Sequence, residues 1–317
     1  MNTPTKLGLY GLGLLVAFAS ALEVGRLAGP QDEPAAHRSS AEHANTDAGA
    51  PAAAAMPGGL QVSDGGYRLV PQTTSVTAGA RAEFRFRILG PDGAPVTRYT
   101  PTHEKDLHLI VVRRDLSGFQ HVHPTLAGDG TWAISLTVAE AGQYRVFADF
   151  QPTGRDTALT LGVDVPAAGA YQPRPLPAPA RTADVDGYRV ELAGDLIPGT
   201  ASKLTPRVTR DSAPVTDLQP YLGAYGHLVA LRDGDLAYLH VHPDGTPGDG
   251  RTAAGPDITF YAEVPSAGVY RVFLDFRHNG TVHTAEFTAA SGAVAAPAAP
   301  SPVQPGASGH DDQHGRG

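Results

Sequence analysis

Alternation of apolar and polar residues is the main pattern of the chain between residues 60 and 290. Residues 82–88 alternate strictly and residues 144–150 nearly so, which places apolar side chains on one face of a strand and most polar ones on the other. Clusters of Gly, Asp and Pro separate such segments, as expected for turns. No segment has the apolar spacing of an amphipathic helix of three turns. The pattern predicts an all-β protein.

The strand-rich region consists of two copies of one unit. Residues 121–124 and 240–243 both read His-Val-His-Pro, and residues 141–150 return almost unchanged as 267–276. The second copy has extra residues in the Gly-, Asp- and Pro-rich loop 244–256, where insertion costs little. Units of about 100 residues with some seven short strands are typical of immunoglobulin-like β-sandwiches. We therefore expect two tandem immunoglobulin-like β-sandwich domains.

An apolar run at residues 7–22 follows Lys6, and small residues at 19–21 offer a signal peptidase site. The run is borderline in length, since about 20 apolar residues are needed to span a bilayer. The sequence therefore fits both a cleaved export signal and a retained membrane anchor. Either one places the rest of the chain outside the cytoplasm, secreted or anchored. The expected order is a signal peptide or membrane anchor at 1–29, a disordered linker at 30–59, β-sandwich repeat 1 at 60–166, a Pro-rich linker at 167–180, β-sandwich repeat 2 at 181–290 and a disordered tail at 291–317.

Composition excludes several classes of function. A formal net charge of −8 leaves no basic patch that could neutralise phosphates, so no nucleic-acid partner is expected. The absence of cysteine excludes disulfides, thiolate zinc sites, iron–sulfur clusters and cysteine nucleophiles. The sequence has no nucleophile elbow, phosphate loop or metalloprotease helix. We therefore predict that the protein is not an enzyme.

Histidines gather on one predicted β-hairpin in each copy. In the first copy the strands are 107–113 and 119–123, joined by a turn at 114–118. His121 and His123 are two apart, so they share a face. If the loop holds an even number of residues, His108 lies opposite one of these two and all three imidazoles converge. The second copy repeats this trio as His227, His240 and His242.

Three imidazoles can hold one metal ion at about 2.0–2.1 Å and leave a fourth position open. Asp149 and Asp275 are candidates for the fourth ligand or for an acceptor that orients an imidazole. Because they share a strand face with Arg145 and Arg271, ordinary ion pairs are an equal alternative. The trios could also cap the sandwich by hydrogen-bonding loop carbonyls, without metal.

The choice of metal follows from the ligand types. Met1 and Met56 are the only methionines, and with no cysteine the soft ligands that select Cu(I) are missing. Imidazole suits Cu(II), Zn(II) and Ni(II), and affinity order favours Cu(II), with zinc close behind. Copper, or zinc, is therefore the expected cofactor.

The remaining histidines and aromatic residues have weaker patterns. His103 has no counterpart in the second copy, and His278 and His283 have none in the first. Each could add a ligand, but we expect these three to be solvated. Tyr144, Tyr270 and Trp132 are expected in the cores of their sandwiches. A further group of histidines (37, 43, 310 and 314) falls in the two tails.

Residues 108–124 resemble a group of bacterial secreted proteins that combine a His-led strand, an Asp-Leu turn and a His-x-His-Pro end. The segment is also similar to the YtkA-like group of exported β-sandwich modules associated with copper proteins. The resemblance covers both repeats and implies an exported immunoglobulin-like module connected with copper handling. Periplasmic copper-resistance carriers are less similar, because their Met-rich segments have no match here.

Together these observations predict an extracytoplasmic metal-binding protein with one three-histidine site per repeat, for metal sequestration or handling. The alternative is a structural or adhesive cell-surface protein whose modules bind no metal. Expected partners are the metal ion and an envelope protein, with membrane contact only through the N-terminal segment.

Overall fold

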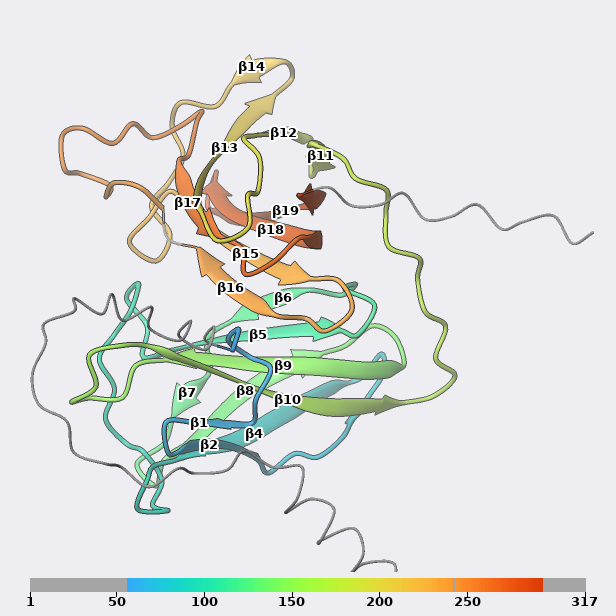
Figure 1. The fold of residues 1–317 in the computed structure, drawn as a ribbon, viewed down its shortest axis with the longest axis vertical. Coiled ribbons are helices and arrows are strands. Elements are labelled where there is room, and N and C mark those ends of the chain that lie inside the picture. Colours follow the sequence, from blue (N-terminus) through green and yellow to red (C-terminus); the bar gives the residue numbers. More distant parts are fainter. Residues whose placement is uncertain (1–55, 242, 293–317) are drawn as a thin grey trace, which may run out of the picture. The chain divides into compact units, whose positions relative to one another are not determined.

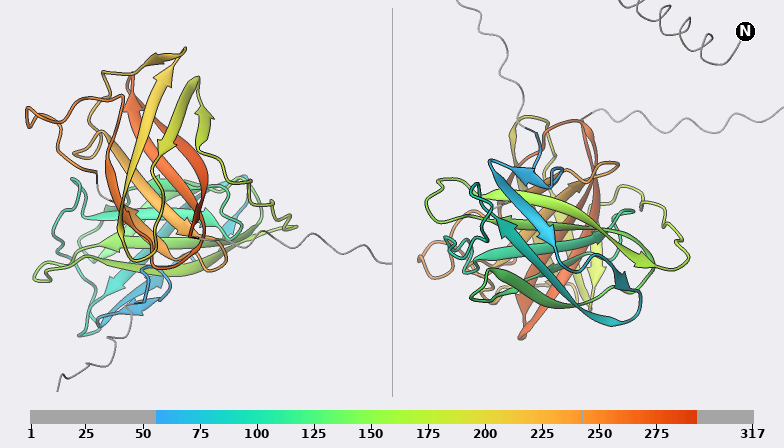
Figure 2. Two further views of the ribbon diagram at one scale, coloured as in Figure 1. Left: turned by 45° about the horizontal axis from the view of Figure 1, so that its top comes forward. Right: turned by 90° about the horizontal axis from the view of Figure 1, so that it is seen from below.

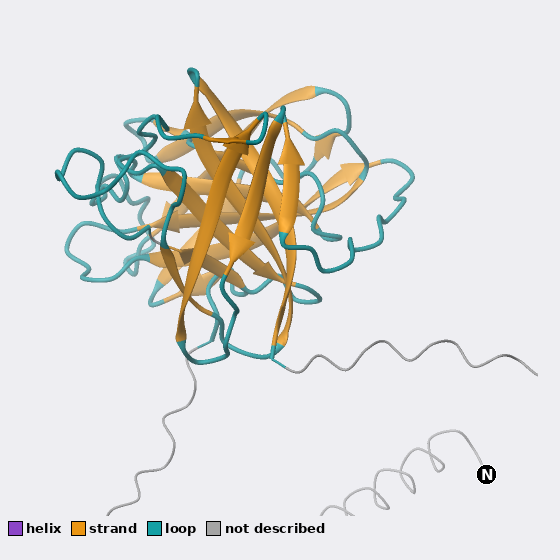
Figure 3. Ribbon diagram, turned by 90° about the horizontal axis from the view of Figure 1, so that it is seen from above, coloured by secondary structure: helices purple, strands orange, loops and turns teal. Residues whose placement is uncertain are grey.

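The computed structural model describes residues 56–241 and 243–292, and every regular element in these ranges is a β-strand (Figure 3). The all-β prediction is confirmed. The apolar run at 7–22 and the tail from residue 293 lie outside the described residues. Within the described ranges, no helix is long and apolar enough to cross a membrane.

Repeat 1 is a sandwich of two sheets (Figure 1). In the right view of Figure 2, which is seen from below, the blue strands of one sheet lie across the green strands of the other. The first sheet has the order β1 (Ser63–Asp64), β2 (Tyr67–Pro71), β4 (Arg81–Leu89), β8 (Thr131–Thr137) and β7 (Thr125–Leu126). The second has the order β3 (Val76–Thr77), β10 (Leu159–Ala168), β9 (Gly142–Phe150), β5 (Leu107–Arg113) and β6 (Gln120–Val122).

Repeat 2 has the same plan with one sheet varied. Its first sheet has the order β11 (Thr182–Val185), β12 (Tyr188–Ala193), β13 (Ala201–Arg210) and β14 (Ala213–Pro214), with β17 (Phe260–Glu263) also paired to β13. Its second sheet has the order β16 (Tyr238–Val241), β15 (Gly226–Arg232), β18 (Gly268–His278) and β19 (Thr281–Ser291).

Each sandwich has its own apolar core, and a tyrosine at one corner of each closes it in the manner of immunoglobulin-like domains. The Tyr144 hydroxyl donates to the Glu140 carbonyl at 2.8 Å, and the Tyr270 hydroxyl donates to the Ser266 carbonyl at 2.9 Å. Trp132 is buried in the first core, as predicted. The two tandem sandwiches expected from the sequence are therefore present.

Strand β5 is buried on both faces, because all seven of its residues are buried. Leu109 points into the core of repeat 1, whereas the next residue, Ile110, lies in a third apolar cluster together with Val229 of β15. This double burial explains why residues 109–112 in the middle of the strand are all apolar instead of alternating. The third cluster draws on both repeats: Ile110, Val112, Leu116, Phe147, Val229, Leu231, Leu236, Tyr238 and Phe273.

Two aromatic stacks between the repeats are equivalent to each other. Phe119 stacks on Phe273 with 4.0 Å between ring centroids, and Tyr238 stacks on Phe147 at 5.2 Å. In the internal repeat Phe119 corresponds to Tyr238, and Phe147 corresponds to Phe273. Each repeat thus offers the same patch to the other, which is the arrangement of an isologous interface. Such stacks each contribute about 0.5–1.5 kcal/mol beyond their buried area.

Candidate metal centre

The β5–β6 hairpin sets the direction of the first histidine trio. Leu109 lies opposite Val122 and Ile110 opposite His121, so the opposed residue numbers sum to an odd value, which is the condition under which the three imidazoles converge. His108 is two residues before Ile110 and therefore shares a face with His121 and His123. The hairpin β15–β16 has the same register, with Val229 opposite His240.

The ring nitrogens of this trio meet closely. Nδ1 of His108 lies 3.0 Å from Nε2 of His121 and 3.2 Å from Nε2 of His123. One nitrogen from each of the three residues lies within 4.8 Å of the other two, which makes them a group that could hold a metal ion. Ligands about 2.0–2.1 Å from a tetrahedral metal lie roughly 3.3 Å apart, so small side-chain movements suffice.

The outer nitrogens of His108 and His121 are held by acceptors, and this fixes their tautomers. Nε2 of His108 donates to the carbonyl of Thr102 at 2.9 Å, and Nδ1 of His121 donates to Oδ2 of Asp275 at 2.8 Å. In the neutral imidazoles the inner nitrogens then carry lone pairs. Two lone pairs that face each other at 3.0 Å repel unless a proton or a cation lies between them.

His123 keeps its inner nitrogen available over a wide range of pH. Burial of the ring, together with the nearby rings and charges of His121, Lys105 and His227, lowers the pKa of His123 to about 3. The imidazole is therefore neutral near pH 7, which is the form that binds metals.

Asp275 belongs to repeat 2, although it holds a histidine of repeat 1. Its Oδ1 accepts from the hydroxyl of Thr284 at 2.6 Å, while its Oδ2 accepts from His121. The side chain is buried, with 6% of its surface exposed. A carboxylate that accepts from the outer nitrogen of a ligating histidine orients the ring and raises its basicity. Of the two roles considered for Asp275, the contacts fit the orienting acceptor.

The two arginines that were considered as ion-pair partners of Asp149 and Asp275 pair with other acids. Arg145 pairs with Asp164 at 3.1 Å, and Arg271 pairs with Glu286. Asp149 lies opposite His108 in the strand register and accepts from the hydroxyl of Tyr238 at 3.4 Å. Asp149 thus lies beside His108 on the neighbouring strand and contacts Tyr238 of the other repeat.

The second trio is described only in part. His227 donates from Nε2 to the Tyr221 carbonyl at 2.8 Å, which is the counterpart of the bond from His108 to Thr102. The side chains of His240 and His242 lie outside the described residues, so a second site stays a prediction. The His227 ring lies 6.5 Å from that of His108 and 6.1 Å from that of His121. No spacing in the sequence predicts this proximity, and the four successive apolar residues 109–112 are the signal for a second packed face.

Three histidines expected in solvent are not there. His103 is half-buried with its ring 5.2 Å from that of His227. His278 is 7% exposed, bonded to the Tyr188 hydroxyl at 2.6 Å. His283 is equally buried and bonds to Asp186 at 2.8 Å. The expectation was wrong because it rested on the lack of a counterpart in the other copy. The alternation in 281–289 places residue 283 on the core face and was the better signal.

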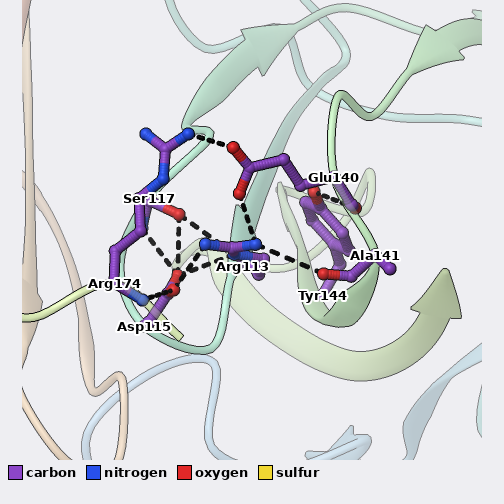
Figure 4. Close-up of polar contacts among 7 residues, drawn as sticks. All are labelled: Arg113, Asp115, Ser117, Glu140, Ala141, Tyr144 and Arg174. Atoms are coloured by element: carbon purple, nitrogen blue, oxygen red, sulfur yellow. Dashed lines mark hydrogen bonds and ion pairs between the residues drawn. The ribbon is translucent and has the colours of Figure 1, made fainter. Parts of the chain in front are cut away.

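A separate polar cluster holds the turn after β5 (Figure 4). Arg113 and Asp115 form a buried ion pair at 2.6 Å. Burial alone would raise the pKa of Asp115, but hydrogen bonds from Arg113, from the backbone N–H of Arg174 and from Ser117 lower it to about 2. This cluster fixes the end of the hairpin and ties the linker to it, and it contains no histidine.

Comparisons with known proteins place the chain by family only. No curated protein matches its sequence. Among solved structures, it is similar to FdeC, an Escherichia coli adhesin, with 16% identity over 73% of this chain and 65% of that one and a TM-score of 0.24. It thus spans less than two-thirds of that adhesin chain. Invasin, a bacterial integrin-binding protein, matches with 14% identity over 70% of this chain and 39% of that one, at a TM-score of 0.20.

A chimeric titin Z1Z2 tandem matches with 15% identity over 70% of this chain and 95% of that one, at a TM-score of 0.18. TM-scores this low carry no argument about function. The family match is more extensive, since residues 61–167 and 183–293 each match the family described as "Domain of unknown function (DUF8832)". The chain therefore belongs to this family and carries two copies of its domain.

Proposed function

We propose that the protein is a non-enzymatic, extracytoplasmic metal-binding protein that holds a divalent cation through His108, His121 and His123. The observation that carries the proposal is the position of Nδ1 of His108, 3.0 Å and 3.2 Å from Nε2 of its two partners. Since Thr102 and Asp275 already accept from the outer nitrogens, the inner ones are directed at a common point. A metal ion there would replace lone-pair repulsion by coordination.

Copper(II) is the proposed ion, with zinc the nearest competitor. An all-imidazole set suits both, and Cu(II) lies above Zn(II) in the affinity order. The similarity to exported modules associated with copper proteins points the same way, and the apolar N-terminal run supports export. Sequestration or handling of the metal fits an open three-histidine site better than a redox reaction, for which the sequence offers no catalytic motif.

Calorimetric titration of the protein with Cu(II) and with Zn(II) tests the proposal. We expect saturable binding that is lost from the first site in the double variant His121→Ala, His123→Ala. A second equivalent that disappears with His240→Ala, His242→Ala would support a site in each repeat. A folded protein without saturable binding of micromolar or tighter affinity would refute the proposal and favour a structural surface protein.

A further inference from the structure

The first histidine trio is surrounded by side chains of the other repeat. Asp275 of β18 accepts from His121 at 2.8 Å, and the hydroxyl of Thr284 on β19 holds the second oxygen of that carboxylate. The ring of Tyr221 lies 6.4 Å from that of His123. His227 adds a second imidazole of repeat 2 at 6.1 Å from the His121 ring. The trio therefore has these four neighbours only when the repeats are docked.

Docking of the two repeats depends on aromatic contacts close to the trio and to Asp275. The stacks of Phe119 on Phe273 and of Phe147 on Tyr238 contain no metal-binding atom. The first of them joins the residue just before β6, which carries His121, to β18, which carries the acceptor. Phe119 is two residues before His121, and Phe273 is two residues before Asp275. Loss of the apolar contact would thus separate the histidine from its carboxylate.

We propose that the metal centre is shared between the repeats, so that a divalent cation bound by the trio locks repeats 1 and 2 in the docked arrangement. This inference rests on the proposed function. Asp275 acts as a positioning residue: it holds His121 in the tautomer that turns Nε2 toward the ion. Coupling is reciprocal, because a cation that prefers the docked state must stabilise that state by the same factor.

The role of Asp275 is tested by titrating the full chain and its Asp275→Asn variant with Zn(II) and Cu(II). Loss of such an acceptor weakens metal binding by about 10–100-fold, and we expect a change in this range. The matched control is Glu286→Gln, an acid of the neighbouring strand that pairs with Arg271 and should leave affinity unchanged. Asp275→Glu, which keeps the acceptor, should recover part of the loss.

A purely structural role for Asp275 predicts a different set of results. It predicts a lower melting temperature of the metal-free variant and an unaltered Cu(II) electron paramagnetic resonance spectrum at saturating copper. The positioning role predicts an altered spectrum, because the His121 ring loses its fixed orientation.

Locking of the repeats is tested with a thiol reporter, because the natural chain has no cysteine. Leu231 is fully buried in the shared cluster, so labelling of a Leu231→Cys reporter requires the repeats to separate or unfold. When reclosing is fast, the labelling rate follows the open population. Saturating Zn(II) should slow labelling by about tenfold or more, within the range usual for coupled sites. Zn(II) is chosen because Cu(II) oxidises thiols.

Two controls separate docking from general stabilisation. Ala262→Cys places the thiol in the core of repeat 2 alone, where Zn(II) should slow labelling much less. His108→Ala in the Leu231→Cys background should abolish the effect of Zn(II). Zn(II) binding that leaves labelling of the Leu231→Cys reporter unchanged, or an unaltered affinity in Asp275→Asn, would overturn the shared centre and leave the proposed function intact. Absence of binding by the natural chain would overturn both.

Discussion

His108 and His227 are each held by the carbonyl of the residue six positions earlier in the chain. A carbonyl can only accept, so both rings carry their proton on Nε2, and Nδ1 of His108 faces His121 and His123. Hydrogen bonds to loop carbonyls had been the alternative to metal binding. The structure shows that one ring nitrogen can make such a bond while the other remains directed at the centre, so the two interpretations do not exclude each other.

The ion pair of Arg113 and Asp115 gives a prediction for stability. Both side chains are almost fully buried, at 1% and 6% exposure, whereas the equivalent pair of Arg232 and Asp235 is more open, with Asp235 at 42%. Asp115→Asn should lower the free energy of unfolding by roughly 2–3 kcal/mol, since it leaves a buried guanidinium short of a partner. Asp235→Asn, the matched control, should cost less than about 1 kcal/mol. Urea denaturation at neutral pH measures both.

The same carboxylate predicts a dependence on pH. The pKa of Asp115 is about 2 in the folded protein, below the value of about 3.9 for an unfolded chain. A depressed pKa stabilises the fold above about pH 4, and this contribution disappears as the pH falls toward about 2. The gap in unfolding free energy between the natural protein and Asp115→Asn should therefore narrow through that window. A gap that stays constant down to pH 2 would contradict the assignment.

At the scale of elements, the two repeats have the same hydrogen bond at the corner where the chain enters the long strand β9 or β18. The tyrosine hydroxyl bonds back to a carbonyl four residues earlier in both β9 and β18. Sequence analysis assigned Tyr144 and Tyr270 to the core, which is correct for their rings, but the hydrogen bond depends on the course of the preceding turn.

Removal of either corner hydroxyl should have a similar effect. Tyr144→Phe and Tyr270→Phe keep the buried ring and lose one hydrogen bond, which costs about 0.5–1.5 kcal/mol. Tyr261→Phe is the control, since its ring is 51% exposed on β17. Chemical denaturation of the three variants measures the difference. If Tyr261→Phe lowers the free energy of unfolding as much as the other two variants do, the corner hydrogen bonds make no specific contribution to stability.

At the scale of the whole chain, the interface between the repeats is held by an apolar cluster as well as by the linker. A protease site placed at residues 177–179, which are exposed, would allow the linker to be cut after folding. We expect the two halves to co-elute in gel filtration without metal, because the cluster and its aromatic stacks remain.

Phe273→Ala should separate the cut halves, because truncation of a buried phenylalanine costs about 3–5 kcal/mol. Val282→Ala, on the exposed part of the neighbouring strand, is the control and should leave them together. Natural halves that separate on cutting would show that docking needs the tether.

The sequence by itself determined the sandwiches, and it tied the direction of the first trio to the parity of one hairpin loop. Alternation in 82–88, and in 144–150 apart from Phe147, predicts which side chains enter the cores, and an even hairpin loop, which the register shows, gives His108 the same face as His121 and His123. These are local properties, set by the period of a strand and by the length of one turn.

The tertiary structure decided what lies against that face. Asp275 follows His121 by more than a hundred residues and comes from the other repeat, so no spacing rule could pair them. The four successive apolar residues 109–112 of β5 are compatible with burial on both sides, but they cannot identify the covering partner. Only the docking of two similar surfaces brings the carboxylate and His227 to the trio, because contacts between distant segments depend on packing and not on local periodicity.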